Sequence, residues 1–281
     1  MINNDPPVSL SAGIHIVSTP IGNLGDITLR AIETLRACTS VACEDTRVTR
    51  RLLKHIGFTK PLVKYNDHST AEERAELIQR ASVEPIALVS DAGTPLISDP
   101  GYQLIRSARA MGINVTAIPG ACAAITALTI AGLPSDKFLF GGFLPTKEKG
   151  KLDVLKELTD IGVTLIFYES APRLVKTLKI IANIWPDRQV AVARELTKLY
   201  ENCVSGTASH VLEFYTQTDP RGEIVLILEP CREMKEEVDL DLLLRNALRI
   251  MKPSNAAAEV SKMTKVDRKT LYTRALELKD K

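Results

Sequence analysis

The chain has 281 residues, of which 45% are hydrophobic and 25% charged, as is ordinary for a globular protein with room for two domains. Its formal net charge of +2 excludes no class of ligand, because basic residues can gather locally while the total stays near zero. No apolar run reaches the roughly 18 residues of a membrane span, and the start, MINNDPPVSL, lacks the basic and apolar regions of a signal peptide. We therefore expect a cytoplasmic protein that does not enter a membrane.

The five cysteines are scattered singly and the four histidines are dispersed, so neither a CxxC nor an HxxxH pair occurs. Structural zinc sites are built from such pairs. We therefore predict no metal site. The cysteines are expected to be small buried apolar residues in a reducing compartment.

An amino-terminal α/β domain is predicted over residues 12–134. Buried strands are expected at 13–18, 40–44, 86–90 and 114–119, and helical periodicity lies between them at 29–38, 71–81 and 101–112. Alternating strands and helices with continuously apolar strands favour a largely parallel sheet covered by helices.

A second α/β domain is predicted over residues 135–230. Its strands are expected at 138–145, 163–169, 189–195 and 223–229, with a helix over 173–185 and a basic loop, TKEKGK, at 146–151. Two comparable domains joined near residue 134 would leave a cleft between them. Small-molecule sites commonly lie at such domain interfaces.

A helical extension is predicted over residues 238–281, after a charged linker at 229–239. The stretch SNAAAEVSKMTKVDRKTLYTRALEL indicates helix, tight turn, helix, with Ser254 and Asp267 as the helix caps. It is similar to a helix-turn-helix but lacks the usual turn glycine. A module that docks on RNA is therefore favoured over one that reads DNA sequence.

Three loops of small residues follow predicted strands: VSTPIGNLGD at 17–26, SDAGTPLISDPG at 90–101 and IPGACAAIT at 118–126. In parallel α/β sheets, ligands bind beyond the carboxyl ends of the strands, where the chain turns into a helix. Neither GxGxxG nor GxxxxGK[ST] is present, which argues against the usual phosphate-binding loops. The loops alone leave two interpretations open: a pocket for a ligand such as S-adenosylmethionine, or turns without a ligand.

Four motifs occur in order: VSTPIGNLGDITLRA, CEDTR, SDAGTPLISDPG and IPGACAAITAL. Together they resemble the signature of the tetrapyrrole-methylase superfamily of S-adenosylmethionine-dependent enzymes, in the variant of its ribosomal-RNA branch, over about residues 12–229. The resemblance implies a homodimer of two-domain subunits with the cofactor in the cleft between the domains. It also implies methylation of a cytidine 2′-hydroxyl in the decoding region of 16S small-subunit ribosomal RNA, within an assembled 30S particle.

The resemblance further implies which residues contact the cofactor, from the three loops and from the second domain. These positions are Pro20, Ile21, Ala92, Gly93, Thr94, Ile97, Ala121, Cys122, Ala123, Tyr168, Glu169, Leu196, Gly222 and Glu223. Thr94 stands where porphyrin-modifying relatives carry an acid, so that carboxylate contact is either lost or supplied by Asp91. Without the resemblance, Ile21, Ile97 and Leu196 are better explained as core residues than as ligand contacts. Cys122 is expected to be a wall residue and not a nucleophile.

Transfer of a methyl group to a ribose hydroxyl benefits from a base that takes the hydroxyl proton. The CEDTR motif places Glu44 and Asp45 at a strand end and Arg47 at the start of a helix, and we predict these three as catalytic residues. Neighbours on a strand point to opposite faces, so one carboxylate is expected to face the cleft. Helix capping by Asp45 is the simpler alternative. Other acids compete for the role of base: Asp99, Glu169 and Glu195.

Basic residues near these motifs and in the tail suit a polyanionic substrate, although a run of charges is often only a solvated face. The predicted RNA contacts are Arg50, Arg51, Lys54, His68, Lys147, Lys149, Lys151, Arg268, Lys269 and Arg274. A capping box of Thr70 and Glu73 explains part of the segment around His68.

Two other functions stay open. The first is methylation of a tetrapyrrole or corrinoid small molecule, which predicts a charge-balanced cleft and no need for a basic tail. The second is a nucleic-acid-binding regulator acting through the tail, which predicts DNA binding without uptake of a cofactor.

Overall fold

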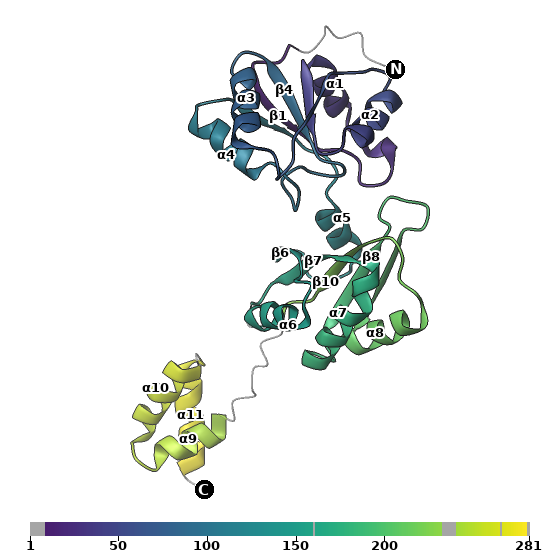
Figure 1. Ribbon diagram of the computed structural model, residues 1–281. Coiled ribbons are helices and arrows are strands. Elements are labelled where there is room, and N and C mark those ends of the chain that lie inside the picture. The colour runs from purple at the N-terminus through teal and green to yellow at the C-terminus, as the bar shows by residue number, and fades with distance from the viewer. Residues whose placement is uncertain (1–8, 160, 232–239, 265, 280–281) are drawn as a thin grey trace. The chain divides into compact units, whose positions relative to one another are not determined.

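The computed structural model describes residues 9–159, 161–231, 240–264 and 266–279 and divides into two units, 1–231 and 232–281. The first unit contains two five-stranded sheets, each with its own helices (Figure 1). The second unit is helical over its described residues. The predicted fold class, two α/β sheets followed by carboxyl-terminal helices, is confirmed.

The first sheet is entirely parallel, with strand order β3-β2-β4-β1-β5. Its strands are β1 (Gly13–Val17), β2 (Ser40–Cys43), β3 (Leu62–Lys64), β4 (Pro85–Val89) and β5 (Val115–Ile118). The helices between them are α1 (Leu29–Ala37), α2 (Thr46–His55), α3 (Ala71–Ala81) and α4 (Tyr102–Ala110), with a short 3-10 helix, η1 (Leu24–Asp26), before α1. All four predicted strands are present, and β3 was not predicted.

Side-chain caps set where these helices begin. The Thr28 hydroxyl accepts from the amide of Ala31 at the start of α1. Thr70 and Glu73 form the predicted capping box at the start of α3, since each side chain accepts from the other's backbone amide.

The second sheet is mixed, with strand order β6-β7-β10-β8-β9. Its strands are β6 (Phe138–Phe143), β7 (Thr164–Ser170), β8 (Gln189–Arg194), β9 (Asn202–Thr207) and β10 (Glu223–Leu228). Only β6 and β7 pair in parallel, and the other pairs are antiparallel, so the expected parallel arrangement holds for the first sheet alone. Four helices belong to this half: α5 (Ala123–Ile130), α6 (Glu148–Glu157), α7 (Ala171–Ile184) and α8 (Ala208–Gln217).

One hydrophobic cluster joins the two halves of the first unit. It covers the face of the second sheet that α5 packs against, through residues such as Ala127 and Val225. Ile21, from the loop after β1, is buried in the same cluster and only 8% exposed. The loops that follow the first sheet are therefore packed directly against the second sheet.

The second unit holds three helices in its described residues: α9 (Leu240–Leu248), α10 (Pro253–Thr264) and α11 (Arg268–Lys279). They share a small core that includes Leu244, Val260 and Leu271. Asp267 caps α11 as predicted, because its Oδ2 accepts from the amide of Thr270 at 3.0 Å. The predicted Ser254 cap is wrong: α10 begins at Pro253, a favoured first helical residue, and Ser254 Oγ accepts from Arg268 Nη2. No helix in the described part of the chain is long and apolar enough to cross a membrane.

Close packing of β6 on β7 generates the first prediction. A Cβ added at Gly141 in β6 would overlap the ring of Phe167 in β7, which is fully buried. We expect Gly141→Ala to lower the free energy of unfolding by about 1–3 kcal/mol, measured by denaturant titration. The control is Gly162→Ala, where an added Cβ meets nothing within 4 Å, and a change of less than about 0.5 kcal/mol is expected there. Equal effects of the two substitutions would contradict the prediction.

Candidate active site

The three small-residue loops meet at the carboxyl ends of β1, β4 and β5. Thr19 and Gly93 exchange backbone hydrogen bonds of 2.8 and 3.1 Å between the first two loops. The Thr94 hydroxyl donates to the carbonyl of Ala121 at 3.0 Å and lies 3.1 Å from Ser18 Oγ, so it connects all three loops. The Thr94 side chain therefore connects the three loops through hydrogen bonds. This is the position at which the resemblance predicted an acid in porphyrin-modifying relatives.

A first cavity, of about 330 Å³, lies between these loops and the second sheet. Every residue predicted to contact the cofactor lines it except Pro20, Ala121 and Asp91. Sequence reasoning did not assign its other lining residues to the cofactor: Ser98, Asp99, Phe143, Ser170, Ile224 and Val225. Ile21 and Leu196 belong both to the core cluster and to this lining, so a core position does not exclude a position in the cavity wall.

A second cavity, of about 340 Å³, shares Ile21, Ala92 and Glu223 with the first. Pro20 and Asp91, which were also predicted to contact the cofactor, line this second cavity. Ala121 lines neither of the two and instead accepts the Thr94 hydrogen bond.

Helix α2 contributes Val48, Thr49, Arg51 and Leu52 to the second cavity. Asp91 Oδ1 accepts from the backbone amide of Asp45 at 3.0 Å and so links the ends of β4 and β2 beside it.

Asp45 and Arg47 of the CEDTR motif are paired with each other. Asp45 Oδ1 accepts from the amide and from Nε of Arg47, at 2.8 and 3.0 Å, and Oδ2 accepts from Nη2 at 2.6 Å. These bonds lower the pKa of Asp45 to about 2, and the Arg47 side chain is 85% exposed. The arrangement agrees with the simpler alternative, capping of α2. Glu44 differs, because burial and the neighbouring Asp91 raise the pKa of its carboxyl.

Asp99 contributes a carboxyl group to the first cavity. Burial raises the pKa of Asp99 to about 6, and the charges of Glu44 and Asp91 act in the same direction, against an opposing hydrogen bond with Ser90. Among the described residues, no Lys, Arg or His forms an ion pair with it. Asp99 is one of the acids that the sequence named as a competing base.

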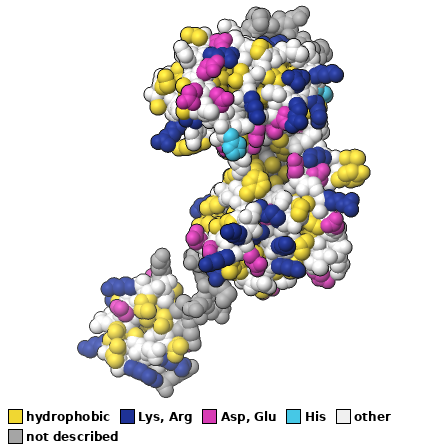
Figure 2. All heavy atoms as spheres, in the orientation of Figure 1, with side chains coloured by type: hydrophobic (Ala, Val, Ile, Leu, Met, Phe, Trp, Pro, Cys, Tyr) yellow, Lys and Arg dark blue, Asp and Glu magenta, His cyan; other side chains and the backbone are white. Residues whose placement is uncertain are grey.

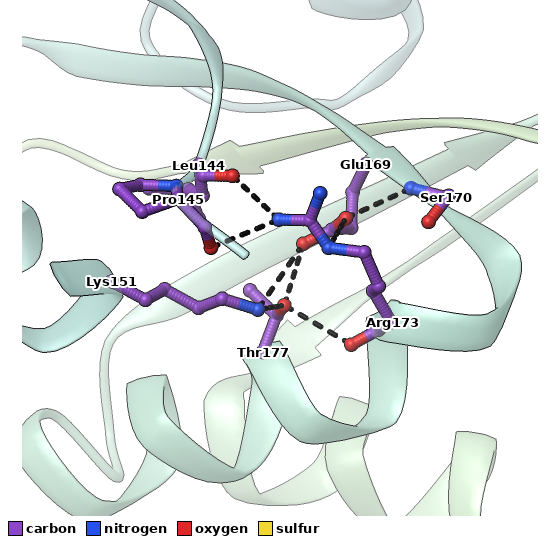
Figure 3. Close-up of polar contacts among 7 residues, drawn as sticks. All are labelled: Leu144, Pro145, Lys151, Glu169, Ser170, Arg173 and Thr177. Atoms are coloured by element: carbon purple, nitrogen blue, oxygen red, sulfur yellow. Dashed lines mark hydrogen bonds and ion pairs between the residues drawn. The ribbon is translucent and has the colours of Figure 1, made fainter. Parts of the chain in front are cut away.

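Glu169 lies at the centre of a buried polar group at the end of β7 (Figure 3). Its carboxylate is fully buried and accepts from the amide of Ser170 at 2.9 Å and from the Thr177 hydroxyl at 2.6 Å. Lys151 Nζ lies 3.6 Å from Oε2, and Arg173 Nε lies 3.1 Å from Oε1. Glu169 therefore lines the first cavity without a free carboxylate.

This group corrects the prediction for Lys151. The side chain is 3% exposed and donates to the Thr177 hydroxyl, and burial lowers the pKa of its ammonium group. Lys151 therefore faces the interior and does not contact RNA in this conformation. Arg173 Nη2 donates to the carbonyls of Leu144 and Pro145, so the buried group holds the start of the basic loop (Figure 3).

The other predicted RNA contacts are exposed. Those on α2 lie within a surface where Lys and Arg side chains gather (Figure 2). The exposed set is Arg50, Arg51, Lys54, His68, Lys147, Lys149, Arg268, Lys269 and Arg274. Arg274 is already paired, because it bonds to Asp241 and Glu277 at 2.6 Å each.

This fold, with a cavity between a parallel and a mixed sheet, is that of a known class of enzymes. The chain belongs to the Tetrapyrrole (Corrin/Porphyrin) Methylases family, which it matches over residues 13–212. Residues 235–279 match the RsmI C-terminal HTH domain. The resemblance stated from the four motifs is therefore confirmed.

Individual relatives are similar over nearly the whole length. The chain is 56% identical over 271 residues to Ribosomal RNA small subunit methyltransferase I of Erythrobacter litoralis (strain HTCC2594), covering 96% of each. It is 45% identical over 273 residues to the protein of the same name from Escherichia coli O157:H7, covering 94% of each.

Two solved structures share the fold at low sequence identity. Diphthine synthase matches with a TM-score of 0.62 and 15% identity, covering 77% of this chain and 89% of that one. Uroporphyrin III C-methyl transferase from Thermus thermophilus matches with a TM-score of 0.54 and 18% identity, covering 77% and 96%.

The buried group around Glu169 generates the second prediction. We expect Glu169→Gln to lower the free energy of unfolding by about 3 kcal/mol, because it leaves Lys151 buried without an anion. Lys151→Met is expected to cost less, since Glu169 keeps Arg173 and Thr177. Thermal and denaturant unfolding measure the change in the free energy of unfolding for both variants. Lys149→Met, at an exposed lysine, is the control, and its change is expected to be less than about 0.5 kcal/mol. A larger loss for Lys151→Met than for Glu169→Gln would contradict this order.

Proposed function

We propose that this chain is an S-adenosylmethionine-dependent methyltransferase that modifies the 2′-hydroxyl of a cytidine in the decoding region of 16S ribosomal RNA. The observation that carries the proposal is the identity to proteins named ribosomal RNA small subunit methyltransferase I, which extends through the carboxyl-terminal helices. A relative similar only in the two sheets would leave the substrate open, because the family takes its name from corrin and porphyrin methylation.

The first cavity suits S-adenosylmethionine. Its volume lies at the lower end of the range for small-molecule sites. One wall is made of small residues, Ala92, Gly93 and Ala123, and the other carries Tyr168, which packs edge-to-face on Phe143 with ring centroids 5.5 Å apart. A flat adenosine therefore fits between backbone and aromatic surfaces. The cofactor supplies an electrophilic methyl group on a sulfonium sulfur.

The second cavity suits the target nucleotide. It shares three residues with the first, so a ribose placed there lies next to the cofactor. Arg51 lines it and is exposed, and no acid among the described residues forms an ion pair with it. A guanidinium in this position matches an RNA phosphate, as charged side chains do in most nucleic-acid contacts. Arg50 and Lys54, on the same helix, extend the basic surface away from the cavity.

The partner is an assembled 30S particle. A particle presents phosphates over a wide area, which suits basic residues spread over α2, the start of α6 (Lys147 and Lys149) and the tail. Arg268 and Lys269 are the exposed cations of α11 that are proposed to contact RNA, whereas Arg274 joins α11 to α9.

The chain is proposed to form a homodimer. Exposed apolar side chains support this: Ile125 and Ile130 on α5 are 45% and 41% exposed, and Phe138 on β6 is 43% exposed. Such residues are common where copies of a chain associate. Sedimentation equilibrium is expected to give the mass of two chains. A single-chain mass at micromolar concentration would contradict the dimer.

Methyl transfer from tritiated S-adenosylmethionine tests the function. Label is expected in the 16S RNA of 30S particles, in alkali-stable dinucleotides, because a 2′-O-methyl group blocks cleavage of the adjacent phosphodiester bond. Porphyrinoids are expected to take up no label. The absence of transfer to both particles and naked RNA would contradict the proposal, and transfer to a porphyrinoid would favour the tetrapyrrole alternative.

Two neighbouring arginines give a matched test of the second cavity. Arg51→Gln is expected to raise KM for 30S particles about tenfold, because one charged contact to the RNA is lost. The affinity for S-adenosylmethionine is expected to stay unchanged. Arg50→Gln, on the same helix but outside the cavity lining, is expected to change KM less than threefold. Equal effects would place the contact on the general basic surface and not in the cavity.

A further inference from the structure

Most acids around the two cavities are already bonded to cations. A carboxylate held in this way is a weak proton acceptor, because protonation would break the ion pair. The acids with such a partner are Asp45, Glu169, Glu195 and Glu223. Among the described residues, Glu44, Asp91 and Asp99 are three carboxylates near the cavities that form no ion pair.

Of these three, Asp99 alone lines the cavity assigned to the cofactor. Asp91 lines the neighbouring cavity, and one of its oxygens accepts from the amide of Asp45. Glu44 lines neither of the two described cavities. Asp99 nevertheless lies close enough to Glu44 and Asp91 for their charges to act on it. It is therefore the acid at the boundary between the cofactor cavity and the carboxylates that end β2 and β4.

The backbone around Asp99 is held in an uncommon conformation. Leu96 and Ser98 have φ angles of 72° and 61°, in the left-handed region that residues other than glycine rarely adopt. Such a conformation costs about 1–3 kcal/mol per residue and is concentrated at functional sites. Here it turns the loop so that Ile97, Ser98 and Asp99 all line the first cavity.

We infer that Asp99 is the general base of the methyl transfer, an inference that rests on the proposed function. The ribose 2′-oxygen forms a bond to the methyl carbon, and the carbon–sulfur bond breaks with its electron pair remaining on sulfur. The Asp99 carboxylate accepts the proton of the hydroxyl. The sulfonium charge and the carboxylate charge both disappear, and the protonated Asp99 returns its proton to water after the product leaves.

The surroundings of Asp99 suit this role. Its burial disfavours the charged form, and the charges of Glu44 and Asp91 add to that effect, which raises its pKa to about 6. The Ser90 hydrogen bond opposes the shift, and the phenol of Tyr168 lies within electrostatic range. A general base is most effective when its pKa lies near the working pH, so that it is ionised and still accepts a proton.

Single-turnover methylation of 30S particles at saturating S-adenosylmethionine tests the inference. Asp99→Asn is expected to slow the transfer by about 10²–10⁴-fold, the usual contribution of a general base. The affinity for S-adenosylmethionine, measured by calorimetry, is expected to change less than threefold. The wild-type rate is expected to rise with pH as Asp99 ionises and to level off above its pKa, whereas the Asp99→Asn rate stays flat.

Glu44→Gln supplies a second, independent readout. Removing the Glu44 charge lowers the pKa of Asp99, so the acidic limb of the rate profile is expected to move to lower pH. Carbon-13 NMR of the Asp99 carboxyl in the cofactor-free chain, assigned by comparison with Asp99→Asn, is expected to show a midpoint near 6 in the wild type and a lower one in Glu44→Gln. A midpoint near the ordinary value of about 4 would overturn the inference.

The other outcomes are equally decisive. Asp187→Asn, an exposed acid outside both described cavity linings, is the control and is expected to keep the wild-type rate. If the Asp99→Asn loss disappears at saturating cofactor, Asp99 is a cofactor ligand and the inference is wrong. If Glu44→Gln abolishes transfer while Asp99→Asn retains it, Glu44 is the base. If the wild-type chain methylates no particle at all, the proposed function fails, and the NMR midpoint still tests the environment of Asp99.

Discussion

The hydroxyl of Thr94 forms the bond on which the arrangement of the site depends. It connects the loop after β4 to the carbonyl of Ala121 and lies within hydrogen-bond distance of Ser18, so one side chain joins the ends of three parallel strands. A carboxylate at this position could not donate to a carbonyl while ionised. The Thr94 hydroxyl therefore gives the three loops a neutral connection in the wall of the first cavity. Asp99, five residues later, lines the same cavity and forms no ion pair with a described Lys or Arg, unlike Glu169 and Glu223.

The sequence predicted the strands that consist of an uninterrupted run of apolar residues. The apolar runs of β1, β2, β4 and β10 are buried along almost their whole length, and each was expected. The strands that were missed, β3 and β9, are an edge strand of three residues and an edge strand that is half exposed. Neither shows the alternation or the apolar run from which a strand is predicted. Each is held by its pairing with the strand before it in the chain, β2 for β3 and β8 for β9, and not by a pattern within its own residues.

The three small-residue loops lie together beside a cavity, but the direction of individual side chains did not follow from the sequence. A basic loop was predicted at 146–151, and its charges indicated solvent-facing residues, but α6 begins at Glu148 and contains Lys151. Lys151 points inward because Glu169, 18 positions later, lies buried at the end of β7 and needs a cation. Pairing of this kind depends on tertiary contacts, so composition and spacing do not reveal it. The division of the site into two adjacent cavities that share one set of loops, with Pro20 and Asp91 on the second, likewise depends on the fold.

The same pairing narrows the chemistry of the site. The sequence favoured Glu44 and Asp45 as candidate bases and left Asp99, Glu169 and Glu195 as competitors. In the folded chain their cation partners separate them: Asp45 is neutralised by the arginine two positions later, and Glu169 by a lysine and an arginine. Such ionised pairs hold backbone in place and resist protonation. A partly buried acid that has no cation partner and lies close to other carboxylates accepts a proton more readily. Burial and the neighbouring negative charges both raise its proton affinity. Asp99 has these surroundings within the cavity that suits the methyl donor, which is why it becomes the strongest candidate for accepting the proton of the ribose hydroxyl.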